Sequence, residues 1–156
     1  MTTGLQSLLA KHPFFEDMSQ EYLDFLAGCG ANTRFAADEY LAREGSSANY
    51  FFILREGQVS HELQGAGRGP VTLLTSGPGD LVGYSWLMPP HRWVFDLRAL
   101  TVVRALMFDG ECLRKKCDED QRLGYDLMKR VARHMIRQFN AVLLRLPDVY
   151  GEPAER

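Results

Sequence analysis

GDLVGYSWLMPPHRWVFDLRALT, residues 79–101, is the stretch of this 156-residue chain around which the other elements can be arranged. It starts with strand-forming residues and a glycine turn, and continues with a short apolar segment, Ser85–Met88, and two prolines. Its second half alternates apolar side chains from Val94 to Ala99. Glycines let the backbone approach a ligand closely, and a one-turn helix leaves free N–H groups that suit an anion. The stretch therefore predicts a cradle for a small anionic group.

This layout resembles the phosphate-binding cassette of cyclic-nucleotide-binding domains, in which a strand, a glycine turn, a short helix and a second strand hold a cyclic phosphate. In that family a Gly-Glu pair supplies a carboxylate for a ribose hydroxyl, and an arginine before a small residue pairs with the phosphate. Counting from Gly83 places Tyr84 at the glutamate position. Counting back from Arg98 places Trp93 at the arginine position, with Arg92 one residue away. The resemblance therefore implies the family's scaffold with altered ligand chemistry.

The cassette supplies most of the candidate ligand-binding residues. Arg92 either pairs with two phosphate oxygens at once or is a solvated loop arginine. Ser85 can donate a hydrogen bond, Trp86 is expected mainly in the core, and Trp93 is expected in a pocket wall. The resemblance also makes the C-terminal helix a lid, with Gln138 facing the base. The predicted ligand-binding residues are Gly83, Tyr84, Ser85, Trp86, Arg92, Trp93, Val94 and Gln138.

Short strand-like segments alternate with turn residues over the middle of the chain. The expected strands are Thr33–Phe35, Tyr40–Arg43, Tyr50–Arg55, Gln58–Gln64, Val71–Thr75, Leu81–Val82, Phe95–Thr101 and Val103–Asp109. Their even spacing predicts an eight-stranded jelly-roll-like barrel, so the fold class is mainly β with flanking helices. The segments EYLAREGSSANYFFILREGQVS (39–60) and LTSGPGDLVG (74–83) also match the strand and turn rhythm of the family.

Helices are expected on both sides of the strands. Residues 4–11 form a short helix, and Ser19 caps a second one that ends near Gly28. Two more follow the strands, at 110–116 and 121–146. We expect a single domain over residues 1–156, made of a helix and β-roll (12–109), C-terminal helices (110–146) and a tail (147–156).

The long helix carries a wide apolar stripe. Leu123, Leu127, Val131, Met135 and Phe139 recur every four residues. Part of this stripe must cover the barrel, and the resemblance implies that the rest forms a parallel helix-pair dimer. We therefore predict a homodimer through Val131, Met135 and Phe139. The alternative is that the whole stripe packs on its own barrel.

The bulk properties limit the possible functions. A net charge of −2 argues against DNA binding by bulk electrostatics. Residues 144–151, LRLPDVYG, resemble the hinge that leads into the helix-turn-helix of cyclic AMP receptor and Fnr-type regulators, but only residues 152–156 follow. No DNA binding by this chain is expected, whether it stands alone or is part of a longer protein.

Enzymatic chemistry is not indicated. The four histidines lie in separate elements without metal-ligand spacing, which argues against a cupin-like metal site, and no nucleophile-elbow motif is present. Three cysteines without metal-type pairing suggest cytosolic thiols, and no apolar run is long enough to span a membrane. We expect a cytoplasmic, non-enzymatic protein without a metal.

Two functional hypotheses remain open. In the first, a sensor binds a cyclic nucleotide or related anionic ligand in the divergent cassette and shifts the long helix. In the second, the module has an empty, degenerate pocket and regulates a partner protein through its surface. The retained glycines and Ser85 favour the first, and the changes at Tyr84 and Trp93 favour the second. Arg133 and Arg137 are expected to be solvated.

Overall fold

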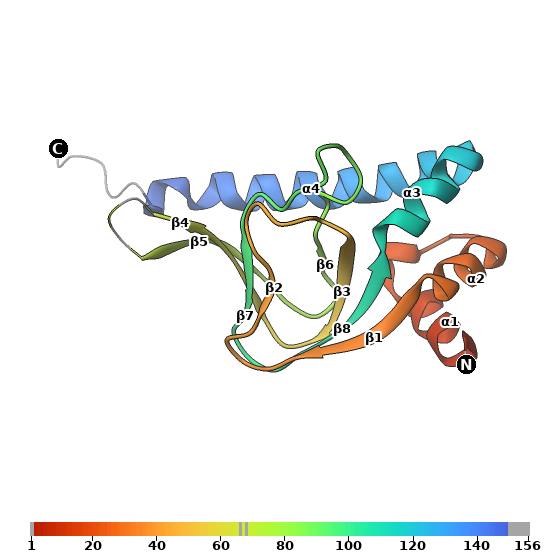
Figure 1. The fold of residues 1–156 in the computed structure, drawn as a ribbon, viewed down its shortest axis with the longest axis horizontal. Coiled ribbons are helices and arrows are strands. Elements are labelled where there is room, and N and C mark those ends of the chain that lie inside the picture. The colour runs from red at the N-terminus through yellow and green to blue at the C-terminus, as the bar shows by residue number, and fades with distance from the viewer. Residues whose placement is uncertain (1, 66, 68, 150–156) are drawn as a thin grey trace.

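The computed structural model describes residues 2–65, 67 and 69–149, and shows a β-roll with helices along one side and at one end (Figure 1). The strands are β1 (Gly30–Phe35), β2 (Tyr40–Ala42), β3 (Tyr50–Glu56), β4 (Val59–Gln64), β5 (Pro70–Ser76), β6 (Leu81–Val82), β7 (Asp96–Ala99) and β8 (Val103–Asp109). The helices are α1 (Thr2–Lys11), the 3₁₀ turn η1 (Pro13–Phe15), α2 (Gln20–Gly28), α3 (Gly110–Glu119) and α4 (Gln121–Val149).

The strands form two four-stranded antiparallel sheets, with orders β1-β8-β3-β6 and β2-β7-β4-β5. This arrangement confirms the predicted fold class, a jelly-roll-like β structure with flanking helices. All eight predicted strands are present. β1 begins at Gly30 instead of Thr33, because the whole segment pairs with β8, from Gly30 opposite Phe108 to Phe35 opposite Val103.

Side-chain caps fix where the helices begin. Ser19 caps α2 as predicted, since its hydroxyl accepts a hydrogen bond from the amide of Tyr22 at 3.3 Å. The Asp109 carboxylate caps α3, and Asp120, between α3 and α4, accepts bonds from two amides of the first turn of α4 at 3.1 Å each. α4 continues to Val149, so the hinge-like segment predicted at 144–151 is helical up to that residue, and the rest of it lies outside the described residues.

Both faces of the central strand β3 are buried, because side chains alternate along a strand. Phe52 and Leu54 lie in the interior of the roll, whereas Phe51 and Ile53 lie in a second core beneath the helices. α4 runs along the roll, and its residue Val131 is only 2% exposed in this second core (Figure 1).

Two of the three residues predicted for a dimer interface remain accessible. Val131 packs within its own chain, so the expectation that it faces a partner is not met by this fold. Met135 is 38% exposed and Phe139 is 63% exposed. Dimerisation itself stays a prediction.

His61 of β4 is a buried titratable group in the roll. Its Nε2 lies 2.8 Å from the Ser76 hydroxyl, and its ring meets Phe95 edge-on at 5.3 Å. Burial lowers the pKa of His61 to about 4 from the ordinary value of 6.5. The folded state therefore holds this imidazole neutral at physiological pH.

We predict that the protein loses stability as the pH falls from 6.5 towards 4. The unfolded chain protonates His61 near pH 6.5, whereas the folded chain does so only near pH 4, so acid favours unfolding in this window. This one group should lower the free energy of unfolding by about 2 kcal/mol between pH 7 and pH 5.

Urea unfolding of the wild type and His61→Gln at both pH values measures this difference. Glutamine can still bond to Ser76, and the other histidines are common to both proteins. The wild type should lose about 2 kcal/mol more than the variant. Equal losses would contradict the prediction.

Candidate ligand-binding cassette

The candidate cassette, residues 79–99, joins the two sheets of the roll. β6 pairs with β3 in one sheet, and β7 lies between β2 and β4 in the other. The one-turn helix expected between them is instead a pair of hydrogen-bonded turns: Leu87 N donates to the Tyr84 carbonyl and His91 N donates to that of Met88, at 3.1 Å each. Pro89 and Pro90 have no N–H group with which to continue a helix.

Trp93 occupies the space beside the cassette glycine. A Cβ atom placed on Gly83 would lie 2.7 Å from Cη2 of the Trp93 ring, so only glycine fits beneath the indole. Gly83 also has a φ of +100°, a conformation that favours glycine. Trp93 is 6% exposed and belongs to the hydrophobic core of the roll. The position at which the family carries its phosphate-binding arginine thus holds a core side chain.

The backbone of Trp93 is fixed by the loop that follows β2. Gly45 N donates to the Trp93 carbonyl at 2.8 Å, and Trp93 N donates to the Ser46 carbonyl at 3.0 Å. Two residues earlier, the His91 carbonyl accepts from Ala48 N at 2.7 Å. Sequence reasoning did not include residues 45–48 in the site, because this contact joins segments that are far apart in the chain.

The same pairing sets the direction of Arg92. Successive side chains of an extended segment point to opposite sides. Because Trp93 points into the roll, Arg92 lies at the surface, where its guanidinium donates to the Gly45 carbonyl at 2.9 Å. Val94, on the other side of Trp93, is exposed as well. In this register Arg92 does not point into the cradle.

The residues that follow Gly83 are partly or fully buried. Tyr84 is half-buried, its ring lies edge-on to Phe95 at 6.4 Å, and burial raises the pKa of its phenol. Ser85 is half-buried beside it. A phenol that stays protonated can accept fewer hydrogen bonds from a ribose than the family's carboxylate can.

Trp86 is a core residue, as expected. It is fully buried and stacks on Phe51 with ring centres 4.9 Å apart. Its carbonyl accepts a hydrogen bond from Arg114 of α3 at 2.6 Å. Gly110, at the start of α3, lies against the same residue, since a Cβ there would be 2.8 Å from Cβ of Trp86. Sequence reasoning missed Arg114, because a basic residue on a short helix gives no signal of its own.

Gln138, the predicted base-reading residue, lies half-buried on α4. Within the described part of the chain, no side-chain hydrogen bond joins Gln138 to the cassette. The structure thus brings Gly83 and Trp93 together and places Arg92 and Val94 on the outside. Ligand binding by any of these residues stays a prediction.

Two further observations bear on the chemistry of the chain. The described residues contain no group of three or more His, Cys, Asp or Glu side chains that could hold a metal ion. None of the described helices is long and apolar enough to cross a membrane.

The comparisons with known proteins agree with this geometry. The sequence model of the cyclic nucleotide-binding domain matches residues 32–120. Cyclic nucleotide-gated ion channel 18 of Arabidopsis thaliana is 28% identical over 145 residues, which cover 86% of this chain and 20% of the channel. This chain therefore spans about a fifth of the length of that relative.

Solved structures show the same architecture. The crystal structure of a cyclic nucleotide-binding protein from Geobacter metallireducens superposes with a TM-score of 0.77 at 26% identity, over 87% of this chain and 96% of that one. A cyclic nucleotide-binding domain from Methylobacillus flagellatus gives a TM-score of 0.78 at 18% identity, over 98% of this chain and 86% of that one. With the family match extending over more than half of its residues, this chain belongs to the cyclic nucleotide-binding domain family.

Proposed function

We propose that this chain is a non-enzymatic regulatory module whose cassette is closed by its own Trp93, and that it acts on a partner through its C-terminal helices. The packing of the Trp93 ring against Gly83 carries this proposal. The family is one of regulatory domains, and the Arabidopsis relative is by its name a gated channel. Because this chain spans only a fifth of that channel, the existence of a regulated partner is also part of the proposal.

Electrostatics support a closed cassette. A buried anion is strongly unfavourable unless a cation and hydrogen bonds offset its charge. Arg92 donates to the Gly45 carbonyl at the surface, and Trp93 fills the space next to Gly83. A cyclic phosphate in this cradle would have to displace the indole and would then meet no guanidinium. We therefore expect cyclic nucleotides to bind weakly.

The contacts of Trp86 provide a route from the cassette to the helices. Arg114 links α3 to the cassette turn through its 2.6 Å bond to the Trp86 carbonyl. Only Asp120 separates α3 from α4. In this proposal, a movement of the cassette turn acts on α3 through this bond, and α3 in turn acts on α4.

A second candidate function is a sensor in which a cyclic nucleotide or related anionic ligand opens the cassette. Residues 91–93 pair with the 45–48 loop over a short stretch only, with an isolated bridge between Ser47 and Arg92. A slip of one residue in an extended pairing exchanges the two faces. Such a slip would turn Arg92 inward and Trp93 outward. The shortness of the pairing is therefore the observation that favours a sensor as the second candidate function.

We predict that the wild type binds cyclic AMP with a dissociation constant of tens of micromolar or weaker, about −6 kcal/mol. Trp93→Arg should tighten binding by about tenfold or more, because it removes the indole and supplies a charge-assisted bond to the phosphate. Val94→Arg is the matched control, since it adds the same charge at an exposed neighbour.

Isothermal titration calorimetry with cyclic AMP compares the affinities of the wild type, Trp93→Arg, Val94→Arg and Arg92→Ala. Under the sensor alternative, Arg92→Ala should weaken binding by about 1.5–3 kcal/mol. Submicromolar binding by the wild type that survives Arg92→Ala would contradict both the closed cassette and the slip.

The exposed side of α4 carries a seam that fits a second copy of the helix. Its apolar residues are spaced alternately three and four apart, which is the heptad pattern of a coiled coil. They are Tyr125, Met128, Ala132, Met135, Phe139, Val142 and Leu146, and all except the half-buried Val142 are exposed. A homodimer through this seam is part of the proposal, with Val131 serving the core of its own chain.

Met135→Glu should convert this dimer to a monomer, because it places a charge in the middle of the apolar seam. Asn140→Glu, an exposed change on the same helix outside the seam, should leave the dimer intact. Size-exclusion chromatography with light scattering distinguishes the two states. A wild type that stays monomeric at high micromolar concentration would show that the seam does not self-associate.

A further inference from the structure

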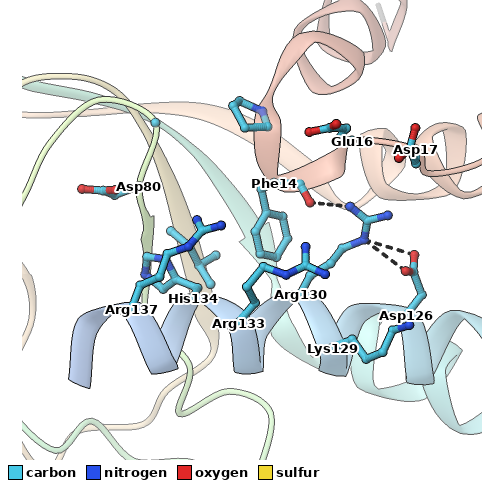
Figure 2. A pocket seen from close by; sticks show the side chains of 13 residues that line it. Phe14, Glu16, Asp17, Asp80, Asp126, Lys129, Arg130, Arg133, His134 and Arg137 are labelled. Atoms are coloured by element: carbon cyan, nitrogen blue, oxygen red, sulfur yellow. Dashed lines mark hydrogen bonds and ion pairs between the residues drawn. The ribbon is translucent and has the colours of Figure 1, made fainter. Parts of the chain in front are cut away.

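A cavity of about 460 Å³ lies outside the roll, between α4, the turn around η1 and the β5–β6 loop (Figure 2). We call it the outer cavity; Phe14, Glu16, Asp17, Arg133 and Arg137 are the lining residues that matter here. None of the predicted ligand-binding residues of the cassette lines it. Its volume is within the range of pockets that take small molecules.

One wall of the outer cavity is cationic. Residues four apart on a helix share a face, so α4 presents Arg133 and Arg137 together. Figure 2 shows both side chains extending from α4 towards Phe14. Among the described residues neither of these arginines forms an ion pair. Both are exposed, as expected for solvated arginines, and both line the cavity.

Arg130, on the same helix, has a different role. Its guanidinium donates to both carboxylate oxygens of Asp126 at 3.2 Å and to the Phe14 carbonyl at 2.6 Å. It therefore fixes the η1 turn to α4 and holds Phe14 over the cavity. Because Asp126 neutralises its charge, the lining cations without an ion pair among the described residues are Lys129, Arg133 and Arg137, of which the two arginines can each match two phosphate oxygens.

The η1 wall has the opposite charge. Glu16 and Asp17 are exposed carboxylates that form no ion pair with any other described residue. The ring of Phe14 reaches into the cavity between the two walls (Figure 2). The outer cavity thus offers guanidinium groups from α4, the aromatic face of Phe14 and the carboxylates of the η1 side, with a further carboxylate, Asp80, near Arg137 (Figure 2).

We propose that the outer cavity binds a nucleoside monophosphate or a small molecule of the same chemistry. Arg133 and Arg137 would hold the phosphate, because guanidinium groups match two phosphate oxygens at once. The base would stack on Phe14. The carboxylates of Glu16 and Asp17 would accept hydrogen bonds from ribose hydroxyl or amino groups. This site shares residues 79–81 with the start of the cassette but contains none of its predicted ligand-binding residues, so it does not depend on whether the cassette is closed.

Calorimetric titration with adenosine 5′-monophosphate and, separately, inorganic phosphate tests the proposal on the whole chain. The nucleotide should bind with a dissociation constant on the order of tens to hundreds of micromolar, and phosphate at least about tenfold more weakly. The double variant Arg133→Gln/Arg137→Gln should bind the nucleotide about tenfold or more weakly. The matched control Arg122→Gln, on the exposed start of α4, should bind as the wild type does, and Arg92→Gln reports separately on whether the cassette takes part.

Phe14→Leu separates stacking from charge, since it leaves the backbone carbonyl that Arg130 uses. It should weaken nucleotide binding several-fold and leave phosphate binding unchanged. Thermal unfolding of each variant checks that it is folded. Three results would each overturn the proposal: no binding of the nucleotide at millimolar concentration, equal weakening by Arg122→Gln, or phosphate binding as tight as nucleotide binding. Loss of binding in Arg92→Gln alone would place the nucleotide in the cassette instead and would also overturn it.

Discussion

The contact between the indole of Trp93 and the backbone of Gly83 is the constraint on which the rest of this cassette depends. It requires a residue without a side chain at Gly83, because a Cβ there would collide with the ring at 2.7 Å. It also requires that Arg92 and Trp93 pair with the 45–48 loop, so that Trp93 points inwards. The direction of Arg92 follows from that pairing, since its neighbour takes the interior side. In the proposed closed cassette, this one contact fills the space beside Gly83 and keeps the guanidinium of Arg92 away from the position that a cyclic phosphate would use.

The surrounding fold offers a regulatory module with a closed cassette, as proposed above, a connection to its C-terminal helices. β3 and β8 are buried on both faces, so the roll and the helices share one sheet as a common support. The cassette turn contacts α3 through Arg114 and Gly110, and α3 leads directly into α4. The inner side of α4 packs on the roll through Leu127 and Val131, while its outer side displays a heptad seam. In the proposed function, this chain of contacts links the position of the cassette to α4 and its seam.

The fold could be predicted from the sequence almost completely, and the site only in part. Alternating apolar residues between turn residues gave all eight strands, because the period of two and the glycines are local signals. The side chain of Trp93 could be assigned to the arginine position, but its direction depends on hydrogen bonds to residues 45–48, which no local pattern contains. Val131 belongs to the same stripe as Met135, and only the packing of α4 on the roll separates the buried residue from the exposed one. The basic residues at 133 and 137 were indistinguishable in sequence from any solvated helix face.

The most direct test is the nuclear Overhauser effect between Hη2 of Trp93 and the α-protons of Gly83, measured with and without one equivalent of cyclic AMP at about 10 μM protein, where a submicromolar site would be filled and a site of tens of micromolar would stay mostly empty. Because Cη2 lies 2.7 Å from the ideal Cβ position of Gly83, the free protein should show a strong cross-peak. A closed cassette predicts that this cross-peak keeps most of its intensity when cyclic AMP is added at this concentration. Its absence from the free protein, or its loss on addition of cyclic AMP, would contradict the closed cassette.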